Sequence, residues 1–406
     1  MKVGIGYCNN SNSFHSGKSV ASEAISNGAV DRPDLVIAFC RGNMDHEAFF
    51  RGIKEVVGDT PVIGGSSIGV ITNKNISYTG FPSGVAIIQS DAIKYQIASF
   101  GEINTDAIRA GSTLASQLSE TFDDKLLLMF YDSIKMPASP NRPPVMNASS
   151  LLIEGIQSTL QSNQLIIGGG LIGDYQFNKT KQFCGSRVCE QSAVGALLSG
   201  SFSVYHAITH GCSPLDGVYH KITKMQDATI YELDGVPIVD IIDDIYMDQD
   251  WQKQHPLNFL TIGVNHGERF FYKENEYVNR LITGIVPNGS GVEMFEPDLE
   301  QGTEIQFMIR DGNKMITSAK KQSEQVVNRI INDGKTPSFA LYIDCAGRAA
   351  GLSNTETEEA IEIQQVMNKY GVPLLGFYSG VEIAPILGKS RGLDWTGVLI
   401  VLAEDN

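Results

Sequence analysis

Three glycine-rich stretches recur along the chain at regular spacing, and this repeat limits the folds that the chain can adopt. Each begins as an apolar run and ends in glycines and small polar residues: Pro61–Gly69, Leu165–Gly173 and Val372–Pro385. Their first glycines, Gly64, Gly168 and Gly376, are separated by 104 and 208 residues, so the second interval is twice the first. We interpret the stretches as buried strands that break into turns, at equivalent positions of a repeated unit.

Around these stretches, apolar runs alternate with amphipathic helical patterns, which is typical of α/β layers with buried strands. Each predicted unit has the order strand, helix, strand, helix, glycine turn and strand. The units occupy residues 2–90, 94–199 and 303–403, and the third is expected to start with a strand at 304–309. The predicted fold class is therefore α/β (mixed α+β), with repeated βαβαβ units that form layered sheets.

A β-rich insertion is expected between the second and third units, at residues 201–300. Turn signals at Asp216-Gly217 and Asn288-Gly289 favour antiparallel strands, and a helix is expected over Val236–Met247. We place a domain boundary near Lys224, which gives domains 1–224 (two units) and 225–406 (the β-rich segment and the third unit). The proline-rich residues 132–147 are expected to form a loop that acts as a lid.

Composition excludes several classes of protein. A net charge of −15 argues against nucleic acid or an anionic membrane as a partner, because both require a positive surface. No segment approaches the ~20 apolar residues that span a bilayer. Six cysteines in 406 residues are too few for a disulfide scaffold. Cys184 and Cys189 lack the second ligand pair of a zinc site. The sequence predicts a cytoplasmic protein with free thiols.

Candidate ligand-binding residues follow the ends of predicted strands, where open α/β sheets bind ligands. Arg348 can bind a carboxylate and Glu382 an ammonium group, so together they suit a zwitterion such as an amino acid. The alternative is a structural ion pair between the two. The expected pocket also contains the turns at Ser66 and Ser67 or at Gly169 and Gly170.

Two further residues stand at strand ends. Cys345 ends the central strand of the third unit, and lining a core or a site is favoured over a nucleophile because the sequence shows no nearby base. His210 precedes Gly211-Cys212-Ser213-Pro214 and could ligate a metal or haem iron, or be a hydrogen-bonded turn residue.

The chain resembles the FIST family of sensory proteins, with its N-terminal and C-terminal domains in tandem. The resemblance rests on an ordered series of motifs: Pro61–Gly69, Ile167–Gly170 with Gly173-Asp174, His210–Pro214, Ile222-Thr223, Glu232–Pro237, Cys345–Arg348 and Val372–Glu382. It implies a cytosolic sensor that binds a small molecule, with amino acids as the suggested ligand class. It also adds Asp174, Tyr378 and Ser379 to the ligand-binding candidates.

Two alternatives stay open. Some family members are haem proteins that sense nitric oxide and regulate histidine kinases. The axial ligand would then be one of His210, His206, His220 and Cys345, and we select His210. An enzyme that uses Cys345 or the Arg348/Glu382 pair is the second alternative. We favour a binding module without catalytic residues, because the sequence has no local nucleophile–base pair or metal constellation. The resemblance implies a separate partner such as a histidine kinase or cyclase, and a homodimer is the expected assembly.

Overall fold

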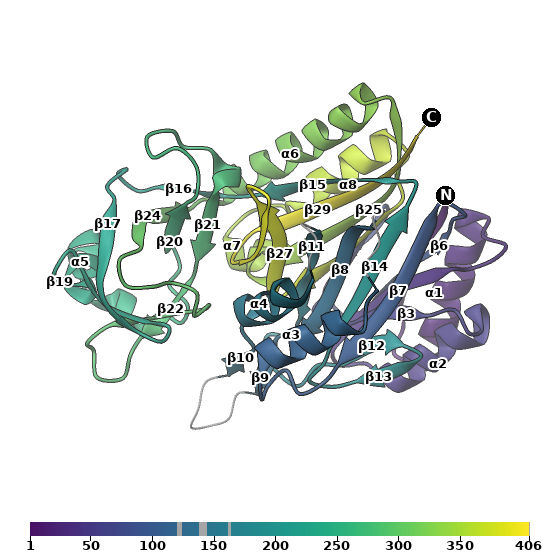
Figure 1. Ribbon diagram of the computed structural model, residues 1–406, viewed down its shortest axis with the longest axis horizontal. Helices are drawn as coiled ribbons and strands as arrows, with labels where there is room; N and C mark the ends of the chain where they lie inside the picture. Colours follow the sequence, from purple (N-terminus) through teal and green to yellow (C-terminus); the bar gives the residue numbers. More distant parts are fainter. Residues whose placement is uncertain (120–123, 138–143, 161–163, 406) are drawn as a thin grey trace.

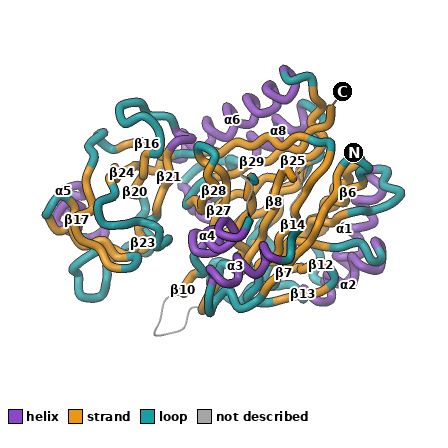
Figure 2. Tube along the Cα trace, viewed as in Figure 1, coloured by secondary structure: helices purple, strands orange, loops and turns teal. Residues whose placement is uncertain are grey.

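The computed structural model describes residues 1–119, 124–137, 144–160 and 164–405 (Figure 1). Among these residues, the strands form three six-stranded sheets, a nine-stranded sheet and a two-stranded ribbon. Figure 1 shows the nine-stranded sheet at one side of a body that contains the three six-stranded sheets. Figure 2 shows that strands fill the middle of this body and that helices lie on its outside. The predicted mixed α/β class is confirmed.

The body consists of three units with the same order of elements. The first contains β1 (Lys2–Asn9), α1 (Ser13–Gly28), β2 (Leu35–Arg41), α2 (His46–Val57), β3 (Val62–Ser67), β4 (Val70–Thr72), β5 (Ile76–Ser77) and β6 (Pro82–Gln89). The second contains β7 (Ile93–Phe100), α3 (Ala107–Ser116), β8 (Asp124–Asp132), β9 (Ile134–Met136), β10 (Val145–Met146), α4 (Ser149–Thr159), β11 (Leu165–Leu171), β12 (Gln182–Gly185), β13 (Arg187–Cys189) and β14 (Ala193–Gly200). The third contains β15 (Ser203–Thr209), α6 (Gly312–Asn332), β25 (Lys335–Cys345), η3 (Ala346–Arg348), α7 (Ala350–Ser353), α8 (Ala360–Lys369), β26 (Leu374–Ser379), β27 (Val381–Ile386), β28 (Lys389–Leu393) and β29 (Gly397–Asp405).

The three sheets share one strand order. In each sheet the first strand of the unit pairs with the last, which pairs with the second, which pairs in parallel with the third: β1-β6-β2-β3, β7-β14-β8-β11 and β15-β29-β25-β26. A hairpin from another unit completes each sheet. The second unit contributes β12–β13 to the sheet of the first unit, and the third unit contributes β27–β28 to the sheet of the second. The first unit contributes β4–β5 to the sheet of the third. This cyclic exchange ties the units into one body.

The three repeated glycines occupy equivalent positions, as predicted, but they lie within strands and not in turns. Gly64, Gly168 and Gly376 pair with Ala38, Met129 and Tyr342 of the neighbouring parallel strand. A Cβ atom at each glycine would lie 2.1, 1.8 and 2.7 Å from the carbonyl oxygen of that partner. The prediction of turns was wrong because glycine here allows close approach of two backbones, which sequence alone does not distinguish from a turn.

The insertion lies between β15 and α6, inside the third unit. It contains β16 (Cys212–Pro214), β17 (His220–Gln226), β18 (Thr229–Leu233), β19 (Val236–Pro237), α5 (Ile238–Tyr246), η1 (Asp250–Lys253), β20 (Leu260–Asn265), η2 (Glu274–Glu276), β21 (Tyr277–Arg280), β22 (Ile282–Ile285), β23 (Val292–Met294) and β24 (Glu304–Arg310). Its strand pairs are antiparallel, which confirms the prediction for this segment.

Two predictions about the third unit and the lid need correction. The strand at 304–309 is β24 of the insertion, and the first strand of the third unit is β15. The error arose because the insertion separates β15 from its following helix, so the strand nearest α6 in sequence was chosen. The predicted lid, residues 132–147, carries the short antiparallel pair β9–β10, and its residues 138–143 lie outside the described part of the chain.

Apolar side chains from all three units meet in one central cluster. Phe39, Phe130 and Phe377 lie at its heart, with ring centroids 4.0 to 5.7 Å apart. Phe39 and Phe130 pair with Gly65 and Gly169 of the adjacent strands, whereas Phe377 pairs with Ile343. On the outside, helix pairs α1–α2, α3–α4 and α6–α8 pack together and cover the sheets. Among the described residues, no helix is long and apolar enough to cross a membrane.

Candidate functional site

A cluster of buried charged side chains lies just past the carboxyl ends of β25 and β26 in the third unit. Asp344 is near the end of β25, Arg348 ends η3, Glu359 precedes α8, and Glu382 is on β27. All four side chains are fully buried. We call these four residues the acidic interior cluster, because three carboxyl groups surround one guanidinium.

Arg348 is held by protein groups on several sides. Its Nη1 donates to the carbonyl oxygen of Trp395 at 2.9 Å, and its Nη2 donates to Thr209 Oγ1 at 3.2 Å and to Glu359. Glu359 also accepts from the hydroxyl of Tyr342. Among the described ion pairs, Arg348 joins Glu359 and Asp344 and not Glu382, so the alternative of a direct Arg348–Glu382 pair was wrong.

Asp344 lacks the hydrogen bonds that a buried carboxylate normally has. Neither side-chain oxygen accepts a hydrogen bond from any described residue, and Arg348 Nε lies 3.6 Å from Oδ1. Burial and the neighbouring Glu359 carboxylate raise the pKa of Asp344 well above its ordinary value, although Arg348 opposes this shift. An unpartnered carboxyl group in the interior is costly, so this position is a candidate for contact with a ligand.

Glu382 is better satisfied. It accepts from Ser379 Oγ at 2.6 Å and from the backbone nitrogen and Oγ1 of Thr396 at 3.2 and 3.1 Å. Burial raises its pKa to about 8, and these hydrogen bonds reduce the shift. Glu382 is therefore largely protonated at neutral pH and contributes little negative charge to the cluster.

Three tyrosines, one from each unit, lie near Glu358, the residue before Glu359. The hydroxyls of Tyr78 and Tyr378 donate to the two oxygens of Glu358 at 2.7 and 3.1 Å, and their rings meet edge to face at 5.7 Å. The hydroxyl of Tyr175 donates to the carbonyl oxygen of Ala346 at 3.1 Å, and Tyr175 is 39% exposed. Burial and the acidic groups of Cys345, Tyr78 and Glu358 raise the pKa of Tyr175.

Several of the residues predicted from sequence meet at the cluster. Ser379 Oγ contacts the carbonyl oxygen of Asp344 at 3.0 Å, and Ser67 Oγ donates to the carbonyl oxygen of Tyr378 at 3.1 Å. Gly169 pairs with Glu382 across the β11–β27 ladder, and Gly170 accepts from the backbone nitrogen of Gly380 at 2.8 Å. These contacts bring the second unit's glycines and the first unit's Ser67 beside the third unit's polar residues.

Three predicted residues have other roles in the structure. Ser66 Oγ is within 2.9 Å of His46 Nε2 and accepts from the backbone nitrogen of Lys181 at 2.8 Å. Asp174 accepts from the backbone nitrogen of Gln176 at 2.9 Å within its own loop. Cys345 is buried, and burial raises the pKa of its thiol well above the ordinary value. A thiol that stays protonated at neutral pH is not activated as a nucleophile.

His210 is buried, and its Nδ1 atom lies 3.2 Å from the side-chain nitrogen of Asn279. The Nε2 atom of His210 is buried without a hydrogen-bond partner among the described residues, as an axial ligand would be. However, a Cβ atom at the adjacent Gly211 would lie 2.7 Å from Met315 and 3.1 Å from Trp395. The backbone next to His210 is therefore closely packed. Burial lowers the pKa of His210 to about 3, so its ring is neutral.

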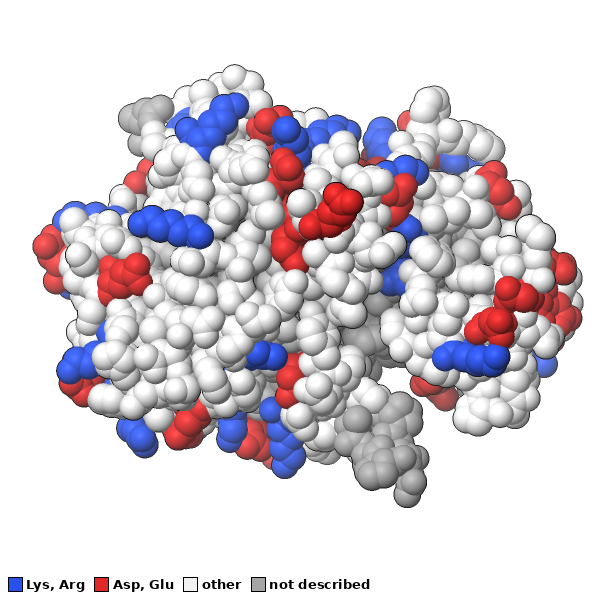
Figure 3. Space-filling model, turned by 180° about the vertical axis from the view of Figure 1, so that it is seen from behind, with Lys and Arg blue, Asp and Glu red and all other residues white. Residues whose placement is uncertain are grey.

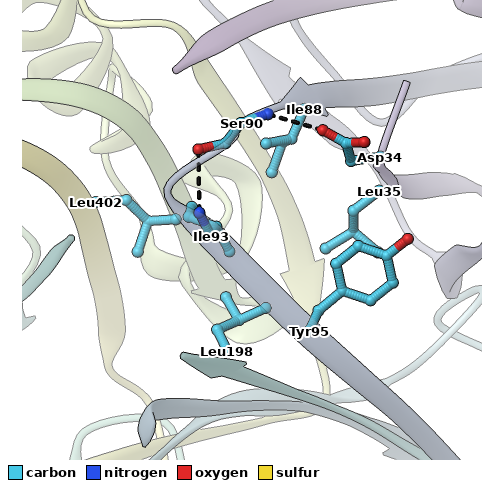
Figure 4. A pocket seen from close by; sticks show the side chains of 8 residues that line it. All are labelled: Asp34, Leu35, Ile88, Ser90, Ile93, Tyr95, Leu198 and Leu402. Atoms are coloured by element: carbon cyan, nitrogen blue, oxygen red, sulfur yellow. Dashed lines mark hydrogen bonds between the residues drawn. The ribbon is translucent and has the colours of Figure 1, made fainter. Parts of the chain in front are cut away.

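Two small apolar cavities lie among the strands of the body, and Asp344 lines neither of them. One is lined by Leu35 at the start of β2, Ile88 and Leu402, and Figure 4 shows that Ser90 and Asp34 hydrogen-bond at its edge. Each cavity has a volume of about 10 Å³, which is close to the space needed for one water molecule. Their few polar groups and small size make the acidic interior cluster the better candidate site.

The surface carries both signs of charge. Figure 3 shows lysine and arginine side chains interspersed with aspartate and glutamate over the face that it displays.

A family model described as the FIST N domain matches residues 34–236, and one described as the FIST C domain matches residues 239–385. Together they cover most of the chain. This protein belongs to the FIST family, whose domains are sensors that bind small ligands in signal transduction. The boundary near Lys224 between domains 1–224 and 225–406 stays a prediction.

Similar proteins come from mycobacteria and an archaeon. An uncharacterised protein of Mycobacterium tuberculosis H37Rv is 27% identical over 264 residues, which are 64% of this chain and 66%, just under two thirds, of the relative. An uncharacterised protein of Mycobacterium bovis is 24% identical over 416 residues and covers 100% of both chains. One from Methanocaldococcus jannaschii is 24% identical over 378 residues, covering 88% of this chain and 67% of the relative.

Two solved structures show distant similarity. A chorismatase has a TM-score of 0.35 with 9% identity and covers 91% of this chain and 92% of its own. A cyanuric acid hydrolase from A. caulinodans has a TM-score of 0.36 with 8% identity and covers 100% of this chain and 99% of its own.

Sequence reasoning missed Glu358, Glu359, Tyr78 and Tyr175. The two glutamates stand in an acidic, polar run that resembles a solvated surface segment, and Tyr78 follows no predicted strand end. Tyr175 had a usable signal, because it directly follows the Gly173-Asp174 motif. Asp344 had a usable signal, because a lone carboxylate interrupts an otherwise apolar strand immediately before its end.

Proposed function

We propose that this protein is a sensor whose ligand presents an ammonium group to Asp344, as an amino-acid-like compound does, and that a separate partner reads the bound state. The observation that carries this proposal is the Asp344 carboxyl group, fully buried with neither oxygen hydrogen-bonded within the described residues. A ligand N–H donor at this place would satisfy a group that otherwise destabilises the fold.

The charge balance supports a cationic group on the ligand. Arg348 is the single cation of the acidic interior cluster, against the carboxyl groups of Asp344 and Glu359. Its Nη1 and Nη2 atoms already donate to protein oxygens, so a ligand carboxylate would have to displace Glu359 to bind it bidentately. An ammonium group between Asp344 and Glu358 adds a positive charge without breaking these contacts.

The tyrosines supply the second element of an ammonium site. Tyr78, Tyr175 and Tyr378 come from three different units and lie around Glu358, where their rings and hydroxyl oxygens can face a cation. Ligand entry would require movement of residues 349–357, which connect Arg348 to Glu358. Leu352 in this segment is 59% exposed, and nothing lies within 4 Å of a Cβ atom placed on Gly351. Such a movement would change the surface that a partner contacts.

Isothermal titration calorimetry with matched ligand pairs tests this proposal. Each amino acid or small amine is compared with its N-acetylated form, which keeps the shape of the side chain and removes the positive charge. We expect binding of at least one free amine and loss of detectable binding by its N-acetyl form. Equal binding of both forms would contradict the ammonium site.

The haem-based alternative, a nitric-oxide sensor for a histidine kinase, has one supporting observation, the unpartnered Nε2 of His210. The absorption spectrum of the purified protein, before and after mixing with haem, separates the two candidates. A Soret band that disappears in His210→Ala would favour haem, whereas the proposal of an amine sensor predicts no His210-dependent band.

A further inference from the structure

The hairpin β12–β13 places two cysteines on one face at the edge of a sheet. Its strands are joined by Gly185 and Ser186, with Gly185 at a φ of 72°, and Cys184 pairs with Arg187 while Gln182 pairs with Cys189. Because side chains alternate along a strand, Cys184, Arg187 and Cys189 point to the same side of the hairpin. β13 is the last strand of the first unit's sheet.

The two cysteines are neighbours, and they differ in exposure. Cys184 and Cys189 occupy diagonal positions of this tight hairpin, close enough for each thiol to shift the pKa of the other. Cys184 is 6% exposed and belongs to the central apolar cluster, whereas Cys189 is partly exposed and packs against that cluster. A partly exposed cysteine thus lies beside a buried one on the same face of the hairpin.

The surroundings shift the pKa values of the two thiols in opposite directions. The neighbouring Cys184 thiol, together with Arg187 and Ser192, lowers the pKa of Cys189 to about 6, although burial opposes the shift. The Cys189 thiol and burial raise the pKa of Cys184 above its ordinary value. At neutral pH the pair therefore consists of one partly exposed thiolate and one protonated thiol, which is the arrangement of a nucleophile and a resolving cysteine.

We propose that Cys189 and Cys184 form a reversible dithiol–disulfide pair that reacts with hydroperoxides. The Cys189 thiolate attacks the terminal peroxide oxygen, the O–O bond breaks, and the leaving alkoxide or hydroxide takes a proton from solvent. Cys184 then loses its proton and attacks the sulfur of the Cys189 sulfenic acid, and the S–O bond breaks as water leaves. Two thiols are oxidised to one disulfide while one hydroperoxide is reduced to water and an alcohol, or to two waters.

The disulfide would constrain a contact between two units. β12 pairs with β3 through Gln182 and Gly65, and the adjacent Lys181 donates its backbone nitrogen to Ser66. Cross-linking β12 to β13 would stiffen the hairpin that the second unit contributes to the sheet of the first unit. This site is separate from the acidic interior cluster, so its test does not depend on the ligand.

The pH dependence of the reaction is a better readout than its rate at one pH. At pH 7 a thiol with a pKa of about 6 is roughly nine-tenths thiolate, against about 3% for an ordinary cysteine. Lower basicity reduces the nucleophilicity of the thiolate about tenfold over this range. The net gain is only about threefold, whereas the midpoint of the rate profile should lie near pH 6 instead of above pH 8.

The test uses the full chain treated with hydrogen peroxide at equimolar concentration, followed by trypsin and mass spectrometry without reduction. Trypsin cleaves after Arg187, so a disulfide joins peptide 182–187 to peptide 188–221. We expect this linked product, with its rate midpoint near pH 6, and its reversal by dithiothreitol. Cys184→Ser should accumulate a Cys189 sulfenic acid trapped by dimedone, and Cys8→Ser, at another partly exposed cysteine, should react like the wild type.

Two results would overturn the proposal. One is the absence of the linked peptides in the wild-type protein while other cysteines are oxidised. The other is a rate profile for Cys189 that rises only above pH 8. Since both are measured on the wild-type chain, they remain decisive even if a cysteine variant folds poorly.

Discussion

The first and third units place the same backbone position in the same sheet environment and give it different chemistry. Cys40 of β2 and Asp344 of β25 each lie two residues beyond the residue that pairs with the repeated glycine. Both side chains are fully buried. Burial raises the pKa of Cys40 well above its ordinary value, so the first unit carries an uncharged thiol where the third has a carboxyl group.

This comparison shows that the fold does not require a carboxyl group at the end of the second strand. A small, uncharged side chain is sufficient in the first unit, and it leaves no costly unpaired polar group in the interior. In the third unit, Asp344 is retained beside Arg348 and Glu359 at a cost in stability. Such local conflicts with the rules of stable packing are expected at functional sites.

The largest expected effect on stability is that of Arg348→Gln. Removing the guanidinium leaves Glu359 and Asp344 without their buried counter-ion, so the free energy of unfolding should fall by about 3–5 kcal/mol. Urea denaturation measures this change. The matched control is Arg41→Gln in the first unit, where Arg41 donates to the carbonyl oxygen of Gly80 and is partly exposed. Similar losses in both variants would break the contrast between the units.

The next largest effect on stability is expected at the repeated glycine that all three units share. Gly168→Ala places a methyl group 1.8 Å from the carbonyl oxygen of Met129, and the strands must separate to admit it. We expect a loss of about 1–3 kcal/mol, the range for overpacking a core. Gly376→Ala should cost less, because its nearest backbone oxygen is 2.7 Å away. Thermal unfolding compares both variants with Gly351→Ala, because nothing lies within 4 Å of a Cβ atom at Gly351. An unchanged melting temperature of Gly168→Ala would refute the claim that the repeated glycine is needed for close approach of the two strands.

Much of this repeated architecture could be predicted from sequence, because apolar periodicity and glycine spacing are local patterns that each unit preserves. The exchange of hairpins could not, since no local pattern shows that β12 pairs with β3 and not within its own unit. The insertion also misled the assignment of β15. At the site, strand ends led to Arg348 and Glu382, but their partners Glu359 and Thr396 are set by tertiary contacts alone.

A smaller effect is the pH dependence of stability. The pKa of Glu382 is about 8 and that of Asp394 about 7 in the folded protein, both raised by burial. These two groups bind more protons in the folded state than in the unfolded state, so their contribution to stability should fall as pH rises from 6.5 to 8. Each group contributes at most about 1.4 kcal/mol per pH unit.

Buried histidines and the Cys189 thiol act in the other direction. Burial lowers the pKa of His46 and His206 to about 4, so their effect fades only above the pKa of an unfolded histidine, about 6.5. Comparing Glu382→Gln with the wild type between pH 6.5 and 8 cancels these groups and isolates the Glu382 carboxyl group. Melting temperature should fall less, or rise more, with pH in Glu382→Gln than in the wild type, and an equal slope would show that Glu382 is ionised in the folded protein throughout this range.

The most direct test of the central claim is Asp344→Asn, because it should change stability least and ligand binding most. The amide keeps the size of the carboxyl group and removes the buried charge, so the melting temperature should stay the same or rise. Affinity for the amine found by calorimetry should fall roughly 10- to 150-fold, which corresponds to about 1.5–3 kcal/mol. Asp216→Asn, in an exposed turn, is the control. If Asp344→Asn lowers the melting temperature and leaves affinity unchanged, Asp344 is a structural residue and the sensor site lies elsewhere.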